Sequence, residues 1–129
     1  MIPRALPTVA VLLALIAAGC GLRRDRLSYE QAAQLTGGDP AAGREKARDY
    51  GCGACHSIPG VPAADGLVGP PLSGIAKRMY VAGVLTNTPD HLVRWIMDPP
   101  AADSSTAMPR VGVSEEDARD IAAYLYSLP

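Results

Sequence analysis

The sequence predicts an all-α domain of about four short helices joined by irregular loops. Three short segments combine a capping side chain with proline or acidic residues just after it, as helix starts do: Asp39-Pro40, Thr88-Pro89 and Ser114-Glu115. The segments between them are rich in proline and glycine, which exclude regular structure. No segment alternates strictly between apolar and polar residues, as a half-buried strand does. A small domain with so much irregular backbone needs a cross-link or a cofactor to complete its core.

The first helix is expected over residues 40–50. Asp39 is a favoured N-cap, and Pro40 suits the first helical position. Charged side chains give this helix an outer face, but it also contains Gly43, which costs about 1 kcal/mol relative to alanine. A helix keeps such a glycine for a reason, and the close approach of a second helix is one.

The next two helices are expected to be short. Residues 72–79 place apolar side chains at i, i+3, i+4 and i+7, which predicts one buried face and a core role for Met79. Thr88-Pro89 begins another helix, whose apolar face includes Trp95 and which ends at Asp98-Pro99-Pro100. A polar loop is then expected over residues 101–113.

The last helix has the clearest start in the chain. Ser114 opens a capping box, and acidic residues follow in the first turn, where they suit the positive end of the helix dipole. An apolar stripe then continues to Leu128, so this helix is expected to face the core.

The N-terminal segment is typical of an export signal. Arg4 precedes an unbroken apolar run over residues 9–18, which is too short to span a bilayer comfortably. The run ends in Ala17-Ala18-Gly19-Cys20, which resembles a bacterial lipoprotein signal, in which the cysteine is lipidated and becomes the mature N-terminus. An ordinary cleaved signal and an uncleaved anchor helix are the alternatives.

These features divide the chain into three parts. Residues 1–19 are expected to be a signal peptide, residues 20–37 a flexible tether with lipid on Cys20, and residues 38–129 a single domain. The domain is therefore expected in the cell envelope, outside the cytoplasmic membrane and anchored to it by lipid.

The motif that carries chemistry is Cys52-Gly53-Ala54-Cys55-His56. Two thiols in this spacing, followed directly by a histidine, are the pattern of covalent c-type haem attachment, in which the histidine becomes an axial ligand of the iron. A redox disulfide and half of a zinc site are the alternatives. Zinc needs two more ligands, and the domain offers only His91 and no further cysteine. A thioredoxin-like motif lies in a βαβ context, which this sequence does not show.

The second axial ligand of the iron must come from elsewhere in the chain. The candidates are Met79, Met97, Met108 and His91. Met79 and Met97 belong to helices with apolar faces, and His91 lies in the first turn of a helix, which favours core or surface roles for all three. Met108 lies in a loop that Pro109 stiffens, so we expect Met108 to bind the iron. With both axial positions filled, electron transfer is expected rather than substrate chemistry.

Three further residues are expected near the cofactor. The carbonyl of Pro70 is expected to accept the ring N–H of His56 and so fix the ring. The indole N–H of Trp95 is expected to donate to a haem propionate. Arg78 either serves another propionate or lies on a solvated helix face.

Composition agrees with a core that a cofactor completes. Phe is absent and there is one Trp, so the chain brings few large aromatic side chains. The chain has 12 basic and 13 acidic residues, so it lacks the basic excess that is typical of a nucleic-acid-binding protein. Lys46 and Lys77 are the only lysines, so contacts with a redox partner are expected to be apolar rather than to use a ring of lysines.

With these residues placed, residues 38–129 resemble class I cytochrome c. The match includes, in family order, the haem pentapeptide, Gly69-Pro70-Pro71-Leu72, Trp95, Met108-Pro109 and Ile121-Ala122-Ala123-Tyr124-Leu125. The resemblance implies about four short helices around one covalently bound haem c, with Gly43 of the first helix against Tyr124 of the last. Ala47 departs from the family, which often has a larger side chain there.

Residues 80–100 are also similar to small membrane-tethered bacterial cytochromes c and to the cytochrome c domain fused to some cytochrome oxidase subunits. This resemblance implies a one-electron carrier of a respiratory chain, not an enzyme, which donates to a terminal oxidase. Its partners would be a cytochrome oxidase or a quinol-oxidising complex. The alternatives are a haem c subunit fixed in a larger respiratory complex, or a haem enzyme or ligand sensor if Met108 does not bind iron.

Overall fold

The computed structural model describes residues 27–129, and α-helices dominate this part of the chain. The elements run in the order α2 (Tyr29–Thr36), α3 (Pro40–Asp49), η2 (Cys52–Ala54), η3 (Ile75–Lys77), β1 (Tyr80–Val81), β2 (Leu85–Thr86), α4 (Pro89–Met97), α5 (Pro99–Ala102) and α6 (Glu115–Ser127). The all-α prediction is confirmed, with one addition: the two-residue strands β1 and β2 pair antiparallel. No helix within residues 27–129 combines the length and the apolar character needed to cross a membrane.

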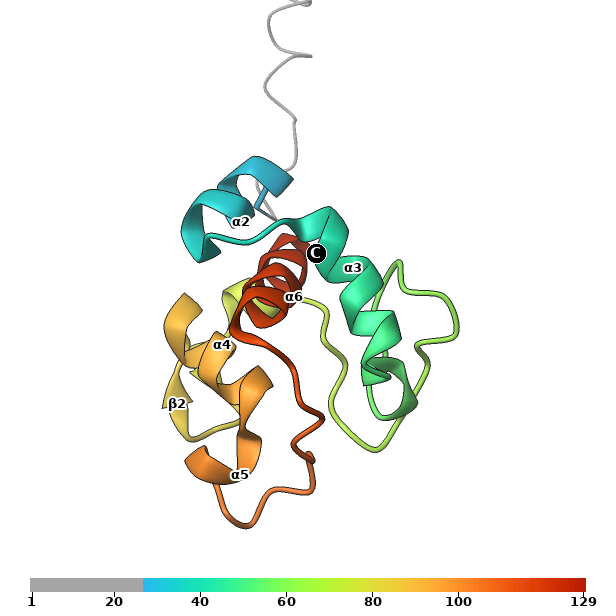
Figure 1. Cartoon of the computed structure of the whole chain (residues 1–129), viewed down its shortest axis with the longest axis vertical. Helices are drawn as coiled ribbons and strands as arrows, with labels where there is room; N and C mark the ends of the chain where they lie inside the picture. Colours follow the sequence, from blue (N-terminus) through green and yellow to red (C-terminus); the bar gives the residue numbers. More distant parts are fainter. Residues whose placement is uncertain (1–26) are drawn as a thin grey trace, which may run out of the picture.

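Helix α6 lies at the centre of the fold, and α2, α3 and α4 all pack against it (Figure 1). Ser114 caps α6 by accepting the backbone N–H of Asp117, as the capping pattern predicts. Every residue from 121 to 128 is buried, so the second half of this helix is enclosed on all sides rather than along one stripe. The apolar core of the domain is built around this enclosed half.

Helices α3 and α6 are in direct backbone contact at Gly43. A Cβ atom placed on Gly43 would overlap the carbonyl group of Asp120, so only glycine permits this approach. The predicted close contact between the first and last helices is therefore confirmed, and the packing of Gly43 against Tyr124 stays a prediction. The nearest atoms of α6 belong to the backbone of Asp120 and Ile121, whereas Tyr124, one turn further along, donates to the carbonyl of Pro59.

The expectation of a flexible tether is corrected for residues 29–36, which form α2. Ser28 and Gln31 make a capping box at the start of this helix, and Gly37 ends it in a left-handed conformation with φ of 75°. Ala32 and Thr36 are buried, and Arg119 of α6 donates to the Thr36 carbonyl at 3.1 Å. Packing on α6 therefore fixes this helix. The predicted signal peptide and Cys20 lie outside the described residues.

The predicted helix over residues 72–79 is wrong. Only Ile75–Lys77 forms a short 3-10 turn, because Gly74 before it has φ of 65° and Arg78 after it is extended. Ile75 is buried, but Met79 is 77% exposed and is not a core residue. The stop expected at Asp98-Pro99-Pro100 is confirmed, because α4 ends at Met97 with Asp98 as its C-cap. Asp98 also caps a further single turn, α5, so the loop expected from residue 101 begins only after Ala102.

Candidate cofactor site

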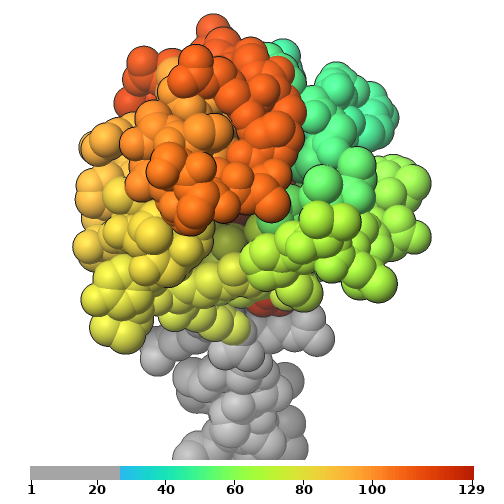
Figure 2. All heavy atoms as spheres, turned by 90° about the horizontal axis from the view of Figure 1, so that it is seen from below, coloured from blue at the N-terminus to red at the C-terminus, as the bar shows by residue number. Residues whose placement is uncertain are grey.

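A cavity of about 560 Å³ opens between the Cys52–His56 segment, residues 68–83, α4 and the loop that follows α5. Its volume falls within the range of about 300–1,000 Å³ that is usual for cofactor and ligand sites. In Figure 2 this region is a hollow bordered by green, yellow and orange segments. Apolar side chains make up much of its wall, among them Leu72, Ile75, Leu92, Ile96, Ile121 and Leu125.

The cysteine–histidine motif forms one wall of the cavity. Cys52 begins the turn η2, and its carbonyl accepts the backbone N–H of His56 at 3.0 Å, so the segment is tightly wound. This turn brings the side chains of Cys52, Cys55 and His56 to the same cavity. Both cysteines are free thiols, and burial raises the pKa of the Cys52 thiol.

The ring of His56 is fixed by the turn that follows. Its Nδ1 lies 2.7 Å from the carbonyl oxygen of Pro70, as the sequence analysis expects. Because a carbonyl only accepts, Nδ1 carries the proton in this contact, and Nε2 is the ring nitrogen that a metal ion could bind. A Cβ atom on Gly69 would overlap the His56 ring, so glycine is needed beside it.

Met108 reaches the same cavity from the loop between α5 and α6. The loop is held on both sides of it, because the Met108 N–H donates to Thr106 Oγ1 at 3.2 Å and Arg110 forms an ion pair with Asp98. The other candidate ligands, Met79, Met97 and His91, are not among the residues that line this cavity. Of the four candidates, only Met108 thus lines the same cavity as His56, and its bond to iron stays a prediction.

Trp95 and Arg78 also line the cavity, as expected. Trp95 is 8% exposed and lies on the buried face of α4. The Arg78 guanidinium donates to the backbone carbonyls of Pro71 and Ser73, so it braces its own loop. Contacts of Trp95 and Arg78 with haem propionates stay predictions.

Residues 40–129 match the sequence model of the Cytochrome c family. The chain belongs to the cytochrome c family. Members of this family carry covalently bound haem c and transfer electrons through it, and they are generally electron carriers rather than enzymes.

A comparison with characterised proteins gives a more distant relative. Cytochrome c oxidase subunit 2 of Alkalihalophilus pseudofirmus is 34% identical to this cytochrome over 87 residues. The match covers 67% of this chain and 25% of the relative, so it spans about a quarter of that protein's length. No solved structure matches the chain.

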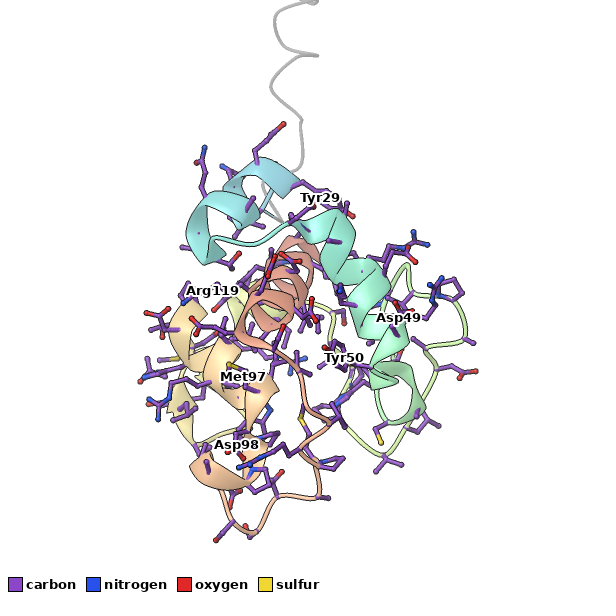
Figure 3. The ribbon with its side chains drawn as sticks, viewed as in Figure 1. Tyr29, Asp49, Tyr50, Met97, Asp98 and Arg119 are labelled. Carbon is purple, nitrogen blue, oxygen red and sulfur yellow. The ribbon has the colours of Figure 1, made fainter. Side chains whose placement is uncertain are left out.

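The cavity of this cytochrome fits haem c. It presents two thiols for the covalent attachment, an imidazole whose Nε2 is not used by the Pro70 contact, and a thioether, all within a largely apolar wall. A more open hollow between α2, α3 and α6 is lined by Asp39, Glu115, Glu116 and Asp120 with Arg119, and contains no thiol, imidazole or thioether. Figure 3 shows Arg119 on the side of α6 that meets α2 and α4.

The sequence analysis did not place Tyr50 and Asn87, among other residues, in the cavity wall. Tyr50 lines the cavity and lies between α3 and the start of α6 (Figure 3). Asn87 also lines it and accepts the hydroxyl of Tyr126 at 2.7 Å. Asn87 marked only a loop in the sequence, and no local pattern could have indicated a partner 39 residues away.

A charged cluster joins α3 to α6 beside this wall. Lys46 Nζ lies 2.8 Å from one carboxylate oxygen of Asp117, and the Tyr50 hydroxyl donates to the other at 2.6 Å. Lys46 first, and then Tyr50, lower the pKa of Asp117 below its ordinary value of 3.8. The cluster therefore stabilises the fold above the ordinary carboxyl pKa, and this contribution is lost as the pH falls through the lowered pKa of Asp117.

Replacing Lys46 with methionine should raise the pKa of Asp117 towards 3.8, because the strongest cause of its lowering is removed. Tyr50→Phe should raise it by less. A carbon-13 NMR titration of the Asp117 carboxyl group measures both shifts. Arg48→Met is the matched control, since Arg48 pairs with Glu45 and Asp49 instead. Equal shifts in the Lys46 and Arg48 variants would show that the contact with Asp117 is not formed.

Proposed function

We propose that this cytochrome carries single electrons in a respiratory chain and donates them to a terminal oxidase. The observation that carries the proposal is that Cys52, Cys55, His56 and Met108 line the same cavity. Cys52 and Cys55 would hold haem c covalently, and His56 and Met108 would both bind its iron, which would leave no position on the iron for a substrate. The similarity to a protein named cytochrome c oxidase subunit 2 favours an oxidase as the partner.

Different residues of the chain would hold the cofactor in different ways. When bound, haem c supplies an iron that changes between its ferric and ferrous states. Cys52 and Cys55 hold the group covalently, and His56 presents Nε2 because the Pro70 carbonyl keeps the proton on Nδ1. Met108 presents its thioether from a braced loop. The largely apolar wall would keep water away from the bound group, so the surroundings would reorganise little when its charge changes.

The surface around the cavity favours an apolar partner. Among residues 27–129, most of the exposed large apolar side chains belong to the cavity wall or to residues next to it in sequence; Tyr29 and Leu35 are the exceptions. Those at or next to the cavity wall are Leu67, Val68, Met79, Tyr80, Val84 and Val111. We call this set the apolar rim. Contiguous exposed apolar surface commonly marks an interaction site. Of the two lysines, Lys46 is engaged with Asp117, and Lys77 is exposed two residues before Met79 of the rim.

The proposal predicts that Leu67→Asp will slow electron transfer to a purified terminal oxidase by about tenfold, an ordinary loss for one interface residue. Leu67 is 90% exposed, so the change should not harm the fold. Leu35→Asp is the matched control, because Leu35 is exposed on α2, outside the rim. Stopped-flow oxidation of the reduced cytochrome measures the rate. Equal rates for the two variants would argue against docking at the rim.

We also propose that lipid on Cys20 anchors the domain outside the cytoplasmic membrane. The supporting feature is Ala17-Ala18-Gly19-Cys20, which resembles a lipoprotein signal. Cys20→Ser should move the protein from the membrane fraction to the soluble fraction of the envelope, with its haem spectrum unchanged. Fractionation and labelling with radioactive palmitate measure the effect. A variant that stays with the membrane would instead support an uncleaved anchor helix.

A further inference from the structure

We propose that Tyr126 is a positioning residue for His56. Tyr126 does not line the cavity, and it acts through Asn87, which does. The pair of Tyr126 and Asn87 holds residues 75–79 against α6. Residues 75–79 in turn hold the segment that begins at Pro70, whose carbonyl fixes the His56 ring. The inference rests on the proposed role of His56 as an iron ligand.

The first step is the bond from Tyr126 to Asn87. Tyr126 is 4% exposed within the enclosed half of α6, and its hydroxyl donates to Asn87 Oδ1 at 2.7 Å. Burial raises the pKa of Tyr126 to about 12, so the hydroxyl remains a donor throughout the physiological range. Because the Tyr126 hydroxyl donates, the Asn87 amide must turn its oxygen towards it, and this sets the orientation of the amide.

The second step is the set of hydrogen bonds from Asn87 to the backbone of residues 75–79. With Oδ1 facing Tyr126, the Asn87 Nδ2 group donates to the carbonyls of Ile75 at 2.7 Å and Arg78 at 2.8 Å. The backbone N–H of Asn87 donates to the Met79 carbonyl at 2.9 Å. A flipped amide would direct Oδ1 at two carbonyl oxygens, so the Tyr126 bond and these two bonds support one another.

The third step connects this loop to His56. Asn87 donates to the carbonyl of Arg78. The Arg78 guanidinium in turn donates to the carbonyls of Ser73 and Pro71. Pro71 directly follows Pro70, whose carbonyl accepts the His56 ring proton. Hydrogen bonds, joined by the covalent links within Arg78 and between Pro71 and Pro70, thus lead from α6 to the acceptor that orients His56. A looser Pro70 carbonyl would hold the Nδ1 proton less well and make the ring a weaker donor to iron.

Tyr126→Phe tests this role, because it removes only the hydroxyl group. In the haem-loaded ferrous protein, the His56 ring N–H should exchange with solvent about fivefold faster, which corresponds to one hydrogen bond of ordinary net strength. The exchange is measured by NMR relative to a backbone amide of α6, which corrects for global unfolding. The reduction potential should also rise.

Tyr124→Phe is the matched control. It lies on the same helix and loses a hydroxyl that donates to Pro59, outside the path to Pro70. Its His56 exchange should stay within about twofold of the wild type once the amide correction is made. Equal acceleration in the two variants would overturn the proposal, because Tyr126 would then contribute only to general stability.

Asn87→Asp provides a second test. Aspartate keeps an oxygen for Tyr126 but has no N–H for the carbonyls of Ile75 and Arg78, so the His56 exchange should rise at least as much as in Tyr126→Phe. Unchanged exchange would also overturn the proposal. Failure of the proposed function looks different: in the haem-loaded wild type, His56 ring signals that show no contact shift in the ferric state would mean that iron does not bind the ring.

Discussion

Met108→Ala should abolish the far-red thioether-to-iron absorption band of the ferric protein while the haem stays attached. The attachment depends on Cys52 and Cys55, which lie on a separate segment from the Met108 loop. Without the thioether the sixth position of the iron is open. The apparent affinity for cyanide should then rise on the order of 100-fold, since the binding-competent state is no longer a minor one.

Met79→Ala is the control for this variant. Met79 is 77% exposed and does not line the cavity, so both the band and the cyanide affinity should match the wild type. If the band instead survives in Met108→Ala, another side chain binds the iron. A wild-type protein that lacks the band and binds cyanide rapidly would favour the alternative of a haem enzyme or a ligand sensor.

The site was more predictable than the loops because its residues carry distinctive chemistry. Cys52, Cys55 and His56 are adjacent in sequence, so their spacing alone indicates their use. Met108 could be chosen because a thioether in a proline-stiffened loop differs from one on an apolar helix face. Pro70 follows from the need of a ligating histidine for an acceptor, and the structure places the two 2.7 Å apart.

The parts that the sequence analysis missed depend on contacts between distant residues. Four apolar positions over residues 72–79 fit a helix, but Gly74 takes a left-handed conformation that limits it to one 3-10 turn. Helix α2 is too short to be stable alone, and it forms where it can bury Ala32 and Thr36. Tyr126 continues an apolar pattern, and only the fold reveals that its hydroxyl meets Asn87.

Gly43→Ala should lower the free energy of unfolding by about 2 kcal/mol. Overpacking costs about 1–3 kcal/mol, and the upper end applies because the added methyl group meets the Asp120 backbone, which cannot rotate away. The higher helix propensity of alanine offsets about 1 kcal/mol of this cost. Denaturant unfolding followed by circular dichroism measures the difference.

The control for Gly43→Ala is the reverse change on the same helix, Ala41→Gly. Ala41 is exposed, so glycine there should cost about 1 kcal/mol through propensity alone. Both changes should therefore destabilise the protein, although one removes a glycine and the other adds one. Stabilisation by Gly43→Ala would mean that propensity decides and that α3 and α6 do not touch. Because α3 leads within three residues to Cys52, the far-red band should disappear together with the helical signal in one transition.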